Sequence, residues 1–395
     1  MMNKEVYLIE GARTPFTSFG GSLATVNAED LGAITAVEAL KRAKVDANSI
    51  DHVIYGNVIH SYKNAAYLSR HIGLKAGVPQ EVPAYTVNRL CGSGLQAVVS
   101  AGQHILLGEA DLVLAGGAEN MSMSPYSNFQ ARLGSIKYGP LHFEDMLLST
   151  LTDDYAGSGM GMTAEKLADK YQLSREEQDA FSLLSQQRAA EARRNGTFAK
   201  EIVEVEVPGR KSRTFVSIDE HIREDITLPA LTSLRPSFKK EGTVTPGNSS
   251  GINDGAASVV VASKKAVEEK GLTPLVKILS WGVAGVDPAI MGIGPVPAIR
   301  QALDKAQLSL SDIDLFEVNE AFAAQYLAVE RELALDREKT NINGGAIALG
   351  HPVGASGTRI LLSLAYELKQ RGVHFGVASL CIGGGQGIAV VIENV

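Results

Sequence analysis

The chain is short of cysteine, of tryptophan and of long apolar runs. It has two cysteines and one tryptophan in 395 residues. Two cysteines cannot build a disulfide framework in a chain of this length, and unpaired thiols suit a reducing compartment. No apolar run approaches the roughly 18 residues that a membrane-spanning helix requires. These shortages argue against a disulfide-stabilised secreted domain and against a membrane-spanning protein.

Excess positive charge and targeting signals are also lacking. The formal net charge is -7, which argues against general binding to nucleic acid. The first residues pass at once into an apolar run at residues 6–9, without the features of a signal or transit peptide. The last residues do not form a peroxisomal signal. We therefore expect a cytoplasmic protein whose partners are small molecules, with no nucleic acid and no membrane among them.

An internal repeat is present. Residues 40–51 align with residues 303–314 at an offset of 263, and Leu, Ala, Ile and Asp recur at equivalent positions. The same offset places Ser93 on Ser356. Each half alternates short apolar runs with helical periods, a pattern typical of α/β layers, and we expect a largely parallel sheet. The repeat predicts two halves of like fold, with the turn at Cys91 and the turn at residues 354–357 in equivalent places.

The character of the sequence changes between the halves. Residues 121–125 resemble a loop, residues 157–162 are rich in glycine and methionine, and Ser174 with Glu177 predicts a capping box for a polar helix. We expect an N-terminal half at residues 1–120 and 246–271, an inserted loop domain at residues 121–245, and a C-terminal half at residues 272–395. The loop domain carries basic residues, and we expect most of them on a solvated surface. A local basic cluster is also what a phosphate-bearing ligand would need; the residues are Arg210, Lys211, Arg213, Arg223, Arg235, Lys239 and Lys240.

Two common nucleotide and metal motifs are not met. The glycines at residues 383–387 precede an apolar strand-like run instead of a helix, so they do not match a dinucleotide-binding fingerprint. No Walker-type sequence and no paired Cys-x-x-Cys spacing occurs. We therefore expect no P-loop and no structural zinc site.

The candidate catalytic residues, two cysteines and a histidine, lie in three turns that are flanked by glycines. His351 lies in NGGAIALGHPVGASG at residues 343–357, Cys91 in NRLCGSG at residues 88–94, and Cys381 in SLCIGGGQG at residues 379–387. Glycine lets a backbone come close to a ligand, and Pro352 restrains the residue after the histidine. Either cysteine alone would be read as an inert buried thiol. Two thiols and a histidine in such turns indicate one constructed site.

The residue types suggest carbon–carbon bond chemistry. Cys91 precedes a predicted helix, whose N-terminus is expected to lower the pKa of the thiol, and a histidine can take its proton. A second thiol is useful where a carbanion must be created or protonated, as in Claisen condensation. The amide of Asn319 could orient a water that binds an oxyanion. The backbone N–H groups of Cys91 and Gly383 could form a second oxyanion site.

At this point the chain resembles the thiolase family, the acetyl-CoA acetyltransferases. The resemblance runs from GARTPF at residues 11–16 through NEAF at 319–322 and GHPVGASG at 350–357 to CIGGG at 381–385. It implies an α/β thiolase fold, with two similar βαβαβαββ halves in α-β-α-β-α layers and an inserted loop domain. It also implies that Cys91 carries the acyl group, that His351 activates Cys91, and that Cys381 moves the proton at the acetyl α-carbon.

The resemblance further implies a reaction and its partners. The expected reaction is the reversible condensation of two acetyl-CoA molecules to acetoacetyl-CoA and CoA, by a ping-pong mechanism through an acyl-cysteine. Coenzyme A is then a co-substrate, with no tightly bound cofactor and no metal, and the expected assembly is a homodimer or homotetramer. The matching coenzyme-A-contacting positions are Met160, Arg223, Ser250, Ala321 and Phe322.

Two departures from the short-chain pattern leave the substrate length open. Gly159 stands where short-chain members usually have histidine, and Ala230 stands where they often have serine. The first alternative is therefore a broader-chain 3-ketoacyl-CoA thiolase of fatty-acid degradation. Decarboxylating ketoacyl synthases use one cysteine with two histidines or a His–Asn pair, so Cys381 argues against them. A non-catalytic acyl-CoA-binding relative and a zinc site made by both cysteines and His351 are the remaining alternatives.

Overall fold

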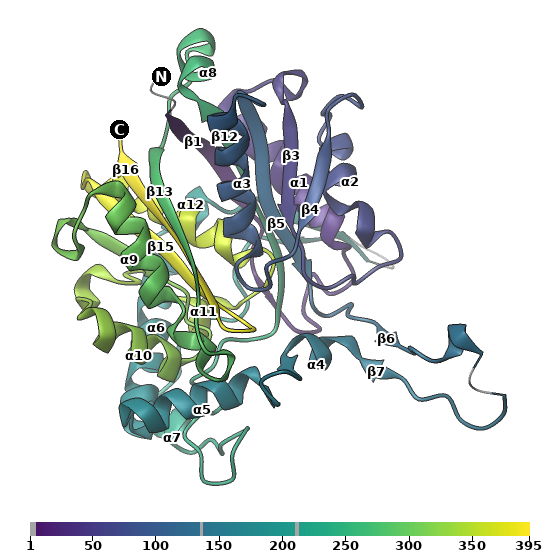
Figure 1. Cartoon of the computed structure of the whole chain (residues 1–395), viewed down its shortest axis with the longest axis vertical. Helices are drawn as coiled ribbons and strands as arrows, with labels where there is room; N and C mark the ends of the chain where they lie inside the picture. Colours follow the sequence, from purple (N-terminus) through teal and green to yellow (C-terminus); the bar gives the residue numbers. More distant parts are fainter. Residues whose placement is uncertain (1–4, 135–136, 210–212) are drawn as a thin grey trace.

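A central mixed sheet organises the computed structural model, which describes residues 5–134, 137–209 and 213–395 (Figure 1). In this part of the chain the sheet has ten strands, in the order β14-β15-β16-β13-β1-β12-β5-β3-β4, with β2 paired to β12. Their bounds are β1 (Val6–Arg13), β2 (Thr17–Ser18), β3 (His52–Gly56), β4 (Ala84–Val87), β5 (Leu112–Asn120), β12 (Asn253–Ser263), β13 (Val276–Gly285), β14 (Leu315–Val318), β15 (Phe375–Ile382) and β16 (Gln386–Asn394).

The expectation of a largely parallel sheet is wrong. Only β3 with β4, β3 with β5, and β14 with β15 are parallel pairs in the described sheet. The chain passes from β15 into β16 through a three-residue turn, and a connection this short can join only antiparallel strands. The two halves also meet through antiparallel pairing of β1 with β13.

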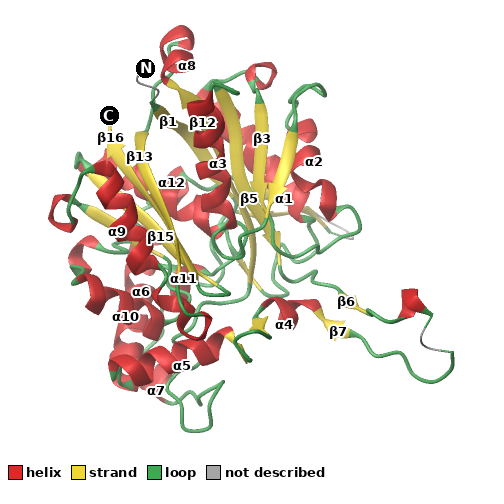
Figure 2. Ribbon diagram, in the orientation of Figure 1, coloured by secondary structure: helices red, strands yellow, loops and turns green. Residues whose placement is uncertain are grey.

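Helices lie on both faces of the sheet, and two further helices lie between its two halves (Figure 2). Helix α1 packs on the strands of the first half and α9 on those of the second, whereas α3 and α12 pack against each other between the halves. The expected layered α/β fold is therefore confirmed. These helices are α1 (Ala28–Ala43), α2 (Leu68–Lys75), α3 (Ser93–Leu107), α8 (Lys264–Lys270), α9 (Pro295–Ala306), α10 (Ala323–Leu333), α11 (Ala346–Leu349) and α12 (Ser356–Arg371).

The repeat seen in the sequence is a repeat of structure. Helix α1 ends at a left-handed residue, Lys44, with φ 54°, and α9 ends at Gln307, with φ 58°, which lies 263 positions later. A left-handed residue at this position closes a helix by satisfying its last carbonyl groups. Helices α3 and α12 begin at Ser93 and Ser356, again 263 positions apart. Equivalent turns therefore precede the two central helices.

The residues between the halves form short helices and hairpins. The capping box of Ser174 and Glu177 is confirmed at the start of α6. The segment from β6 to β7 extends away from the body of the molecule (Figure 1). The elements are β6 (Tyr126–Ser127), β7 (Glu144–Asp145), α4 (Met146–Thr150), β8 (Thr152–Asp153), β9 (Ser158–Gly159), α5 (Met160–Tyr171), α6 (Arg175–Arg194), β10 (Val205–Pro208), β11 (Arg213–Val216) and α7 (Leu228–Thr232).

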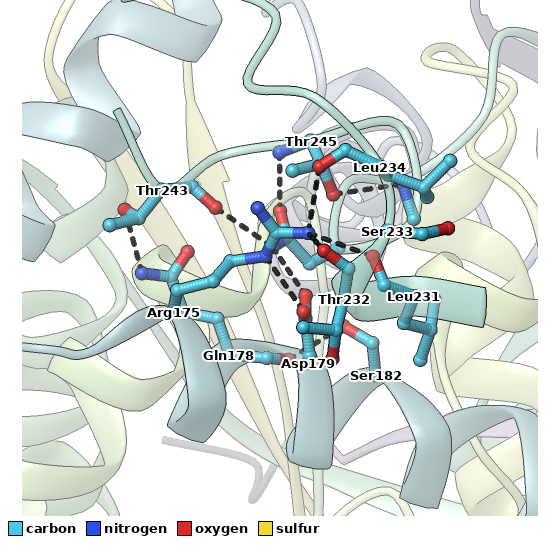
Figure 3. A network of polar contacts seen from close by, with 12 residues as sticks. Arg175, Gln178, Asp179, Ser182, Leu231, Thr232, Ser233, Leu234, Thr243 and Thr245 are labelled. Carbon is cyan, nitrogen blue, oxygen red and sulfur yellow. Dashed lines mark hydrogen bonds and ion pairs between the residues drawn. The ribbon is translucent and has the colours of Figure 1, made fainter. Parts of the chain in front are cut away.

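Hydrogen bonds and an ion pair at the start of α6 connect several segments of this region (Figure 3). Arg175 pairs with Asp179 and donates to the carbonyl groups of residues 231, 232 and 234. Asn248 donates to Asp179 at 3.0 Å, and its own carbonyl accepts the N–H of Ala323 at the start of α10. The network therefore extends from α6 to the segment just after Asn319. Among the described residues, no helix is both long and apolar enough to cross a membrane.

Candidate active site

Four of the predicted site residues lie in turns or at the ends of strands. Cys91 lies between β4 and α3, Asn319 directly follows β14, His351 lies between α11 and α12, and Cys381 is the penultimate residue of β15. Because the two halves repeat, the turns before α3 and α12 approach the same place from opposite halves.

The turn that holds His351 packs closely on the first half because the residues it contacts are glycines. A Cβ on Gly117 would lie 1.9 Å from the carbonyl oxygen of Gly354, and a Cβ on Gly94 would lie 2.8 Å from the same oxygen. Both distances are shorter than real Cβ contacts allow. Thr358 then donates a 3.0 Å hydrogen bond to the Gly94 carbonyl. Glycine at these positions therefore lets the histidine turn rest directly on the first half.

The Cys91 thiol is half-buried beside the glycine turn of the second half. Its side chain packs against a buried apolar cluster of Ile59, Met121, Leu147 and Val353. Burial raises the pKa of the Cys91 thiol, while the backbone N–H groups of Gly383 and of Cys91 itself act to lower it. The expectation that the helix N-terminus would lower this pKa is therefore wrong, because removal from water has the larger effect.

Cys381 lies in a drier setting next to the first thiol. It is fully buried with Met291 and Ala321, and Met160 and Phe322 pack against this group. Burial raises the pKa of Cys381, and the neighbouring Cys91 raises it further. The two thiols are thus neighbours in different environments, one accessible in part and the other enclosed.

This difference predicts unequal reactivity of the two thiols. Iodoacetamide at pH 7.5 should alkylate Cys91 faster than Cys381, because Cys381 is fully buried whereas Cys91 is half-buried and reachable by the reagent. Peptide mass spectrometry over a time course measures both rates in one sample. Faster labelling of Cys381 would contradict the arrangement described here.

His351 is buried and held at three atoms. Its backbone N–H donates to Asn253 at 2.9 Å, and its Nδ1 lies 2.6 Å from the Ser356 hydroxyl. Its Nε2 lies 3.5 Å from the amide nitrogen of Asn319. Burial, and then the positive charge of Arg359, lower the pKa of His351 to about 4. The ring is therefore neutral at pH 7 and has one nitrogen free to accept a proton.

Asn319 and several predicted coenzyme A positions lie around the thiols. The Asn319 side-chain oxygen is buried and has no hydrogen-bond partner among the described residues. Ser250 donates its backbone N–H to the Ala321 carbonyl at 2.9 Å, and Ala321 is in the group around Cys381 with Met160 and Phe322. These positions are thus brought together at one side of Cys381.

Three of the basic residues have separate contacts or exposures in the described chain. Arg223 is exposed, and its backbone N–H donates to Gln186 on α6. Arg213 pairs with Glu206, and Lys239 pairs with Asp169. Arg210 and Lys211 lie outside the described residues.

Glu119 is a buried residue that the sequence interpretation missed. One carboxyl oxygen accepts from the Asn57 side chain and the Ile59 N–H, and the other from the N–H groups of Val58 and Gly354. It thereby fastens the histidine turn to the first half. Burial raises the pKa of Glu119 to about 8, against the lowering effect of these N–H donors. The sequence signal was an acidic residue at the end of an otherwise apolar strand.

Glu119→Gln should destabilise the fold. Whichever oxygen becomes the amide nitrogen, two N–H donors lose their acceptor, at a cost of about 1–3 kcal/mol for each buried group. Urea unfolding of this variant is compared with Glu109→Gln, which alters an exposed carboxylate and should change stability by less than about 0.5 kcal/mol. The comparison is made at pH 9, above the raised pKa of Glu119, so that the carboxylate is ionised and can accept all four donors. Unchanged stability of Glu119→Gln at that pH would contradict the clamp.

The described chain holds no group of three or more His, Cys, Asp or Glu side chains arranged to bind a metal ion.

Comparison with known proteins places this fold in a family of enzymes that transfer acyl groups. The model of the thiolase N-terminal domain matches residues 6–265, and that of the thiolase C-terminal domain matches residues 272–394. The chain belongs to the thiolase family.

Relatives cover almost the whole chain. Human mitochondrial 3-ketoacyl-CoA thiolase is 51% identical over 98% of both chains. Acetyl-CoA acetyltransferase of Syntrophomonas wolfei is 49% identical over 99% of this chain and all of the relative. The crystal structure of the human enzyme in complex with CoA matches with a TM-score of 0.96 and 51% identity, over 99% of this chain and 98% of that chain.

These comparisons correct one expectation. The cytoplasmic location expected from the sequence is contradicted, because mammalian relatives at 50–52% identity are mitochondrial enzymes by name. A composition without an obvious Arg-rich leader was a weak basis for that expectation.

Proposed function

We propose that the protein cleaves 3-ketoacyl-CoA with CoA to give a shortened acyl-CoA and acetyl-CoA, and that it also runs the reverse condensation. The observation that carries this proposal is a pair of neighbouring thiols, Cys91 and Cys381, against which the turn of the neutral, buried His351 packs. His351 itself lies beside Asn319. Simple hydrolysis needs one thiol and one base. A second enclosed thiol fits a reaction that must also protonate a carbanion.

The first half-reaction uses the partly exposed thiol. His351 takes the proton of Cys91, and the sulfur attacks the 3-keto carbon of the substrate. The N–H groups of Cys91 and Gly383, which already act on this sulfur, are placed to stabilise the oxyanion. The carbon–carbon bond then breaks to leave an acyl group on Cys91 and the enolate of acetyl-CoA.

The enolate requires a proton and the acyl group requires an acceptor. Cys381 donates its proton to the α-carbon of the enolate, whose oxygen is held near Asn319 and His351. Acetyl-CoA leaves, and the Cys381 thiolate takes the proton of the CoA thiol, whose sulfur attacks the acyl-Cys91 carbonyl and releases the shortened acyl-CoA. Cys91 leaves as the thiolate and takes its proton back from His351, so all three groups return to their starting state. This sequence is a ping-pong mechanism with coenzyme A as co-substrate.

We further propose that the acyl chain can exceed that of acetoacetyl-CoA. Gly159 lies just before α5, and a Cβ built there would meet only the Leu151 carbonyl at 3.5 Å and the Thr152 hydroxyl at 3.9 Å. The next residue, Met160, packs on the group around Cys381 and has a flexible side chain that can adapt to different ligands. The relatives include enzymes named for 3-ketoacyl-CoA as well as for acetyl-CoA. An enzyme restricted to acetoacetyl-CoA is the second candidate.

Gly159→His tests the chain length. The backbone at Gly159 has φ -70°, so histidine fits without backbone strain. Wild-type enzyme should cleave 3-ketohexanoyl-CoA and 3-ketooctanoyl-CoA with kcat/KM within about tenfold of that for acetoacetyl-CoA, a difference of about 1.4 kcal/mol. The variant should selectively lose the longer substrates. Ala230→Ser, at the other departure from the short-chain pattern, should leave the ratio unchanged. Wild-type activity confined to acetoacetyl-CoA would favour the second candidate.

We also infer three parts for the chain. The two family matches, which end and begin at residues 265 and 272, support a boundary between the halves near residue 271. Residues 121–245 are then a loop domain that contributes to coenzyme A binding, with Arg223 on its surface. We propose a homodimer or homotetramer as the assembled form, which light scattering of the purified protein tests.

A further inference from the structure

Ser356 is buried at the first residue of α12, directly beside the histidine of the site. Its hydroxyl lies 2.6 Å from Nδ1 of His351 and donates to the carbonyl oxygen of Pro352 at 3.0 Å. A serine hydroxyl has one proton and two acceptor lone pairs. If its proton is donated to the Pro352 carbonyl, the hydroxyl can interact with Nδ1 only as an acceptor.

The neighbour of the other ring nitrogen fits the same assignment. The amide nitrogen of Asn319, which can only donate, lies 3.5 Å from Nε2 of His351. Such a donor favours an unprotonated Nε2. Both neighbours of the neutral ring therefore select the same tautomer, with the proton on Nδ1 and a lone pair on Nε2.

From this geometry we propose that Ser356 is a positioning residue that fixes the Nδ1–H tautomer of His351 and so leaves Nε2 as the base for Cys91. The inference rests on the proposed function, in which His351 takes the Cys91 proton. In the opposite tautomer Nε2 carries a proton and cannot accept another, and Nδ1 is occupied by the serine. The hydrogen bond made by one ring nitrogen thus decides which nitrogen is reactive.

The backbone of the turn holds both partners of this contact in place. The Pro352 carbonyl also accepts the N–H groups of Ala355 at 2.9 Å and of Ser356 at 3.0 Å. The His351 N–H is fixed on Asn253. Backbone hydrogen bonds at His351 and at Ser356 therefore fix both ends of the turn and set the distance between the Ser356 hydroxyl and the imidazole ring. The ring of Pro352 also restricts the φ angle of that residue within the turn.

The tautomer can be read directly by ¹⁵N NMR of protein with ring-labelled histidine. The His351 signals are assigned by their loss in His351→Asn. In the resting enzyme at pH 7 we expect a protonated, pyrrole-type Nδ1 and an unprotonated, pyridine-type Nε2. A protonated Nε2 would overturn the proposal, and this reading needs no Ser356 variant to fold.

Ser356→Ala tests the consequence for catalysis. Single-turnover acylation of Cys91 should slow by about 10–100-fold with little change in KM, and the His351 spectrum should show a mixture of tautomers. The matched control is Ser363→Ala on the same helix, which removes a hydroxyl that donates to Glu201 at 2.6 Å. It should acylate at the wild-type rate. If folded Ser356→Ala also acylates within twofold of wild type, the proposal is overturned.

Different results would contradict the proposed function and the role of Ser356. Absence of acylation in the wild-type enzyme defeats the proposed function, whereas normal acylation with a protonated Nε2 defeats only the role of Ser356.

Discussion

Cys91→Ala is expected to lose thiolysis by a factor on the order of 10⁴–10⁶, the range seen when a covalent nucleophile is removed. The structure gives this variant no substitute nucleophile, because the neighbouring thiol, Cys381, is fully buried among apolar side chains. Burial also raises the pKa of that thiol. Steady-state thiolysis of acetoacetyl-CoA and of a six-carbon substrate measures the loss.

The fold should tolerate the Cys91→Ala change. Cys91 is half-buried, and its removal takes away one sulfur at the edge of an apolar cluster. Urea unfolding should therefore remain close to that of wild type. A folded Cys91→Ala variant that keeps more than about one hundredth of the activity would show that another group carries the acyl chain.

Cys381→Ala is expected to separate the two half-reactions. Acylation of Cys91 by an acyl-CoA should continue, because His351 and the N–H of Gly383 are unchanged. Exchange of the acetyl-CoA α-protons with deuterium should fall by about 10²–10⁴, the usual contribution of a general acid or base. Mass spectrometry follows the first reaction and proton NMR the second.

The two readouts act as controls for each other. Loss of both would indicate damage to the site as a whole, since Cys381 is packed with Met291 and Ala321. Exchange at the wild-type rate with normal acylation would show that Cys381 is not the acid–base group.

Local signals in the sequence predicted much of the architecture. Because the repeat has an offset of 263, the positions of α9 and α12 follow from those of their counterparts α1 and α3. The ends of these helices depend on nearby residues such as Lys44 and Gln307. The capping box at α6 was readable for the same reason. Glycine-framed turns identified Cys91, His351 and Cys381 as candidates before their positions were known.

Features that depend on distant contacts were not predictable in this way. The antiparallel pairing of β1 with β12 and with β13 joins segments far apart in the sequence, so the sheet was wrongly expected to be largely parallel. The pKa of Cys91 is raised by burial, and the cluster that Cys91 packs against comes from four other segments, which include Leu147 and Val353. The clamp by Glu119 and the contact of Ser356 with the histidine likewise join residues whose partners the sequence pattern does not reveal.

The central claim is that Cys91 carries the acyl group, and acid-quenched peptide mass spectrometry tests it most directly. Wild-type protein is mixed with an acyl-CoA in the absence of free CoA, quenched within seconds and digested. We predict the mass of the acyl group on the peptide that contains Cys91 and an unmodified peptide for Cys381. The acyl group on Cys381, or on neither cysteine, would contradict the account.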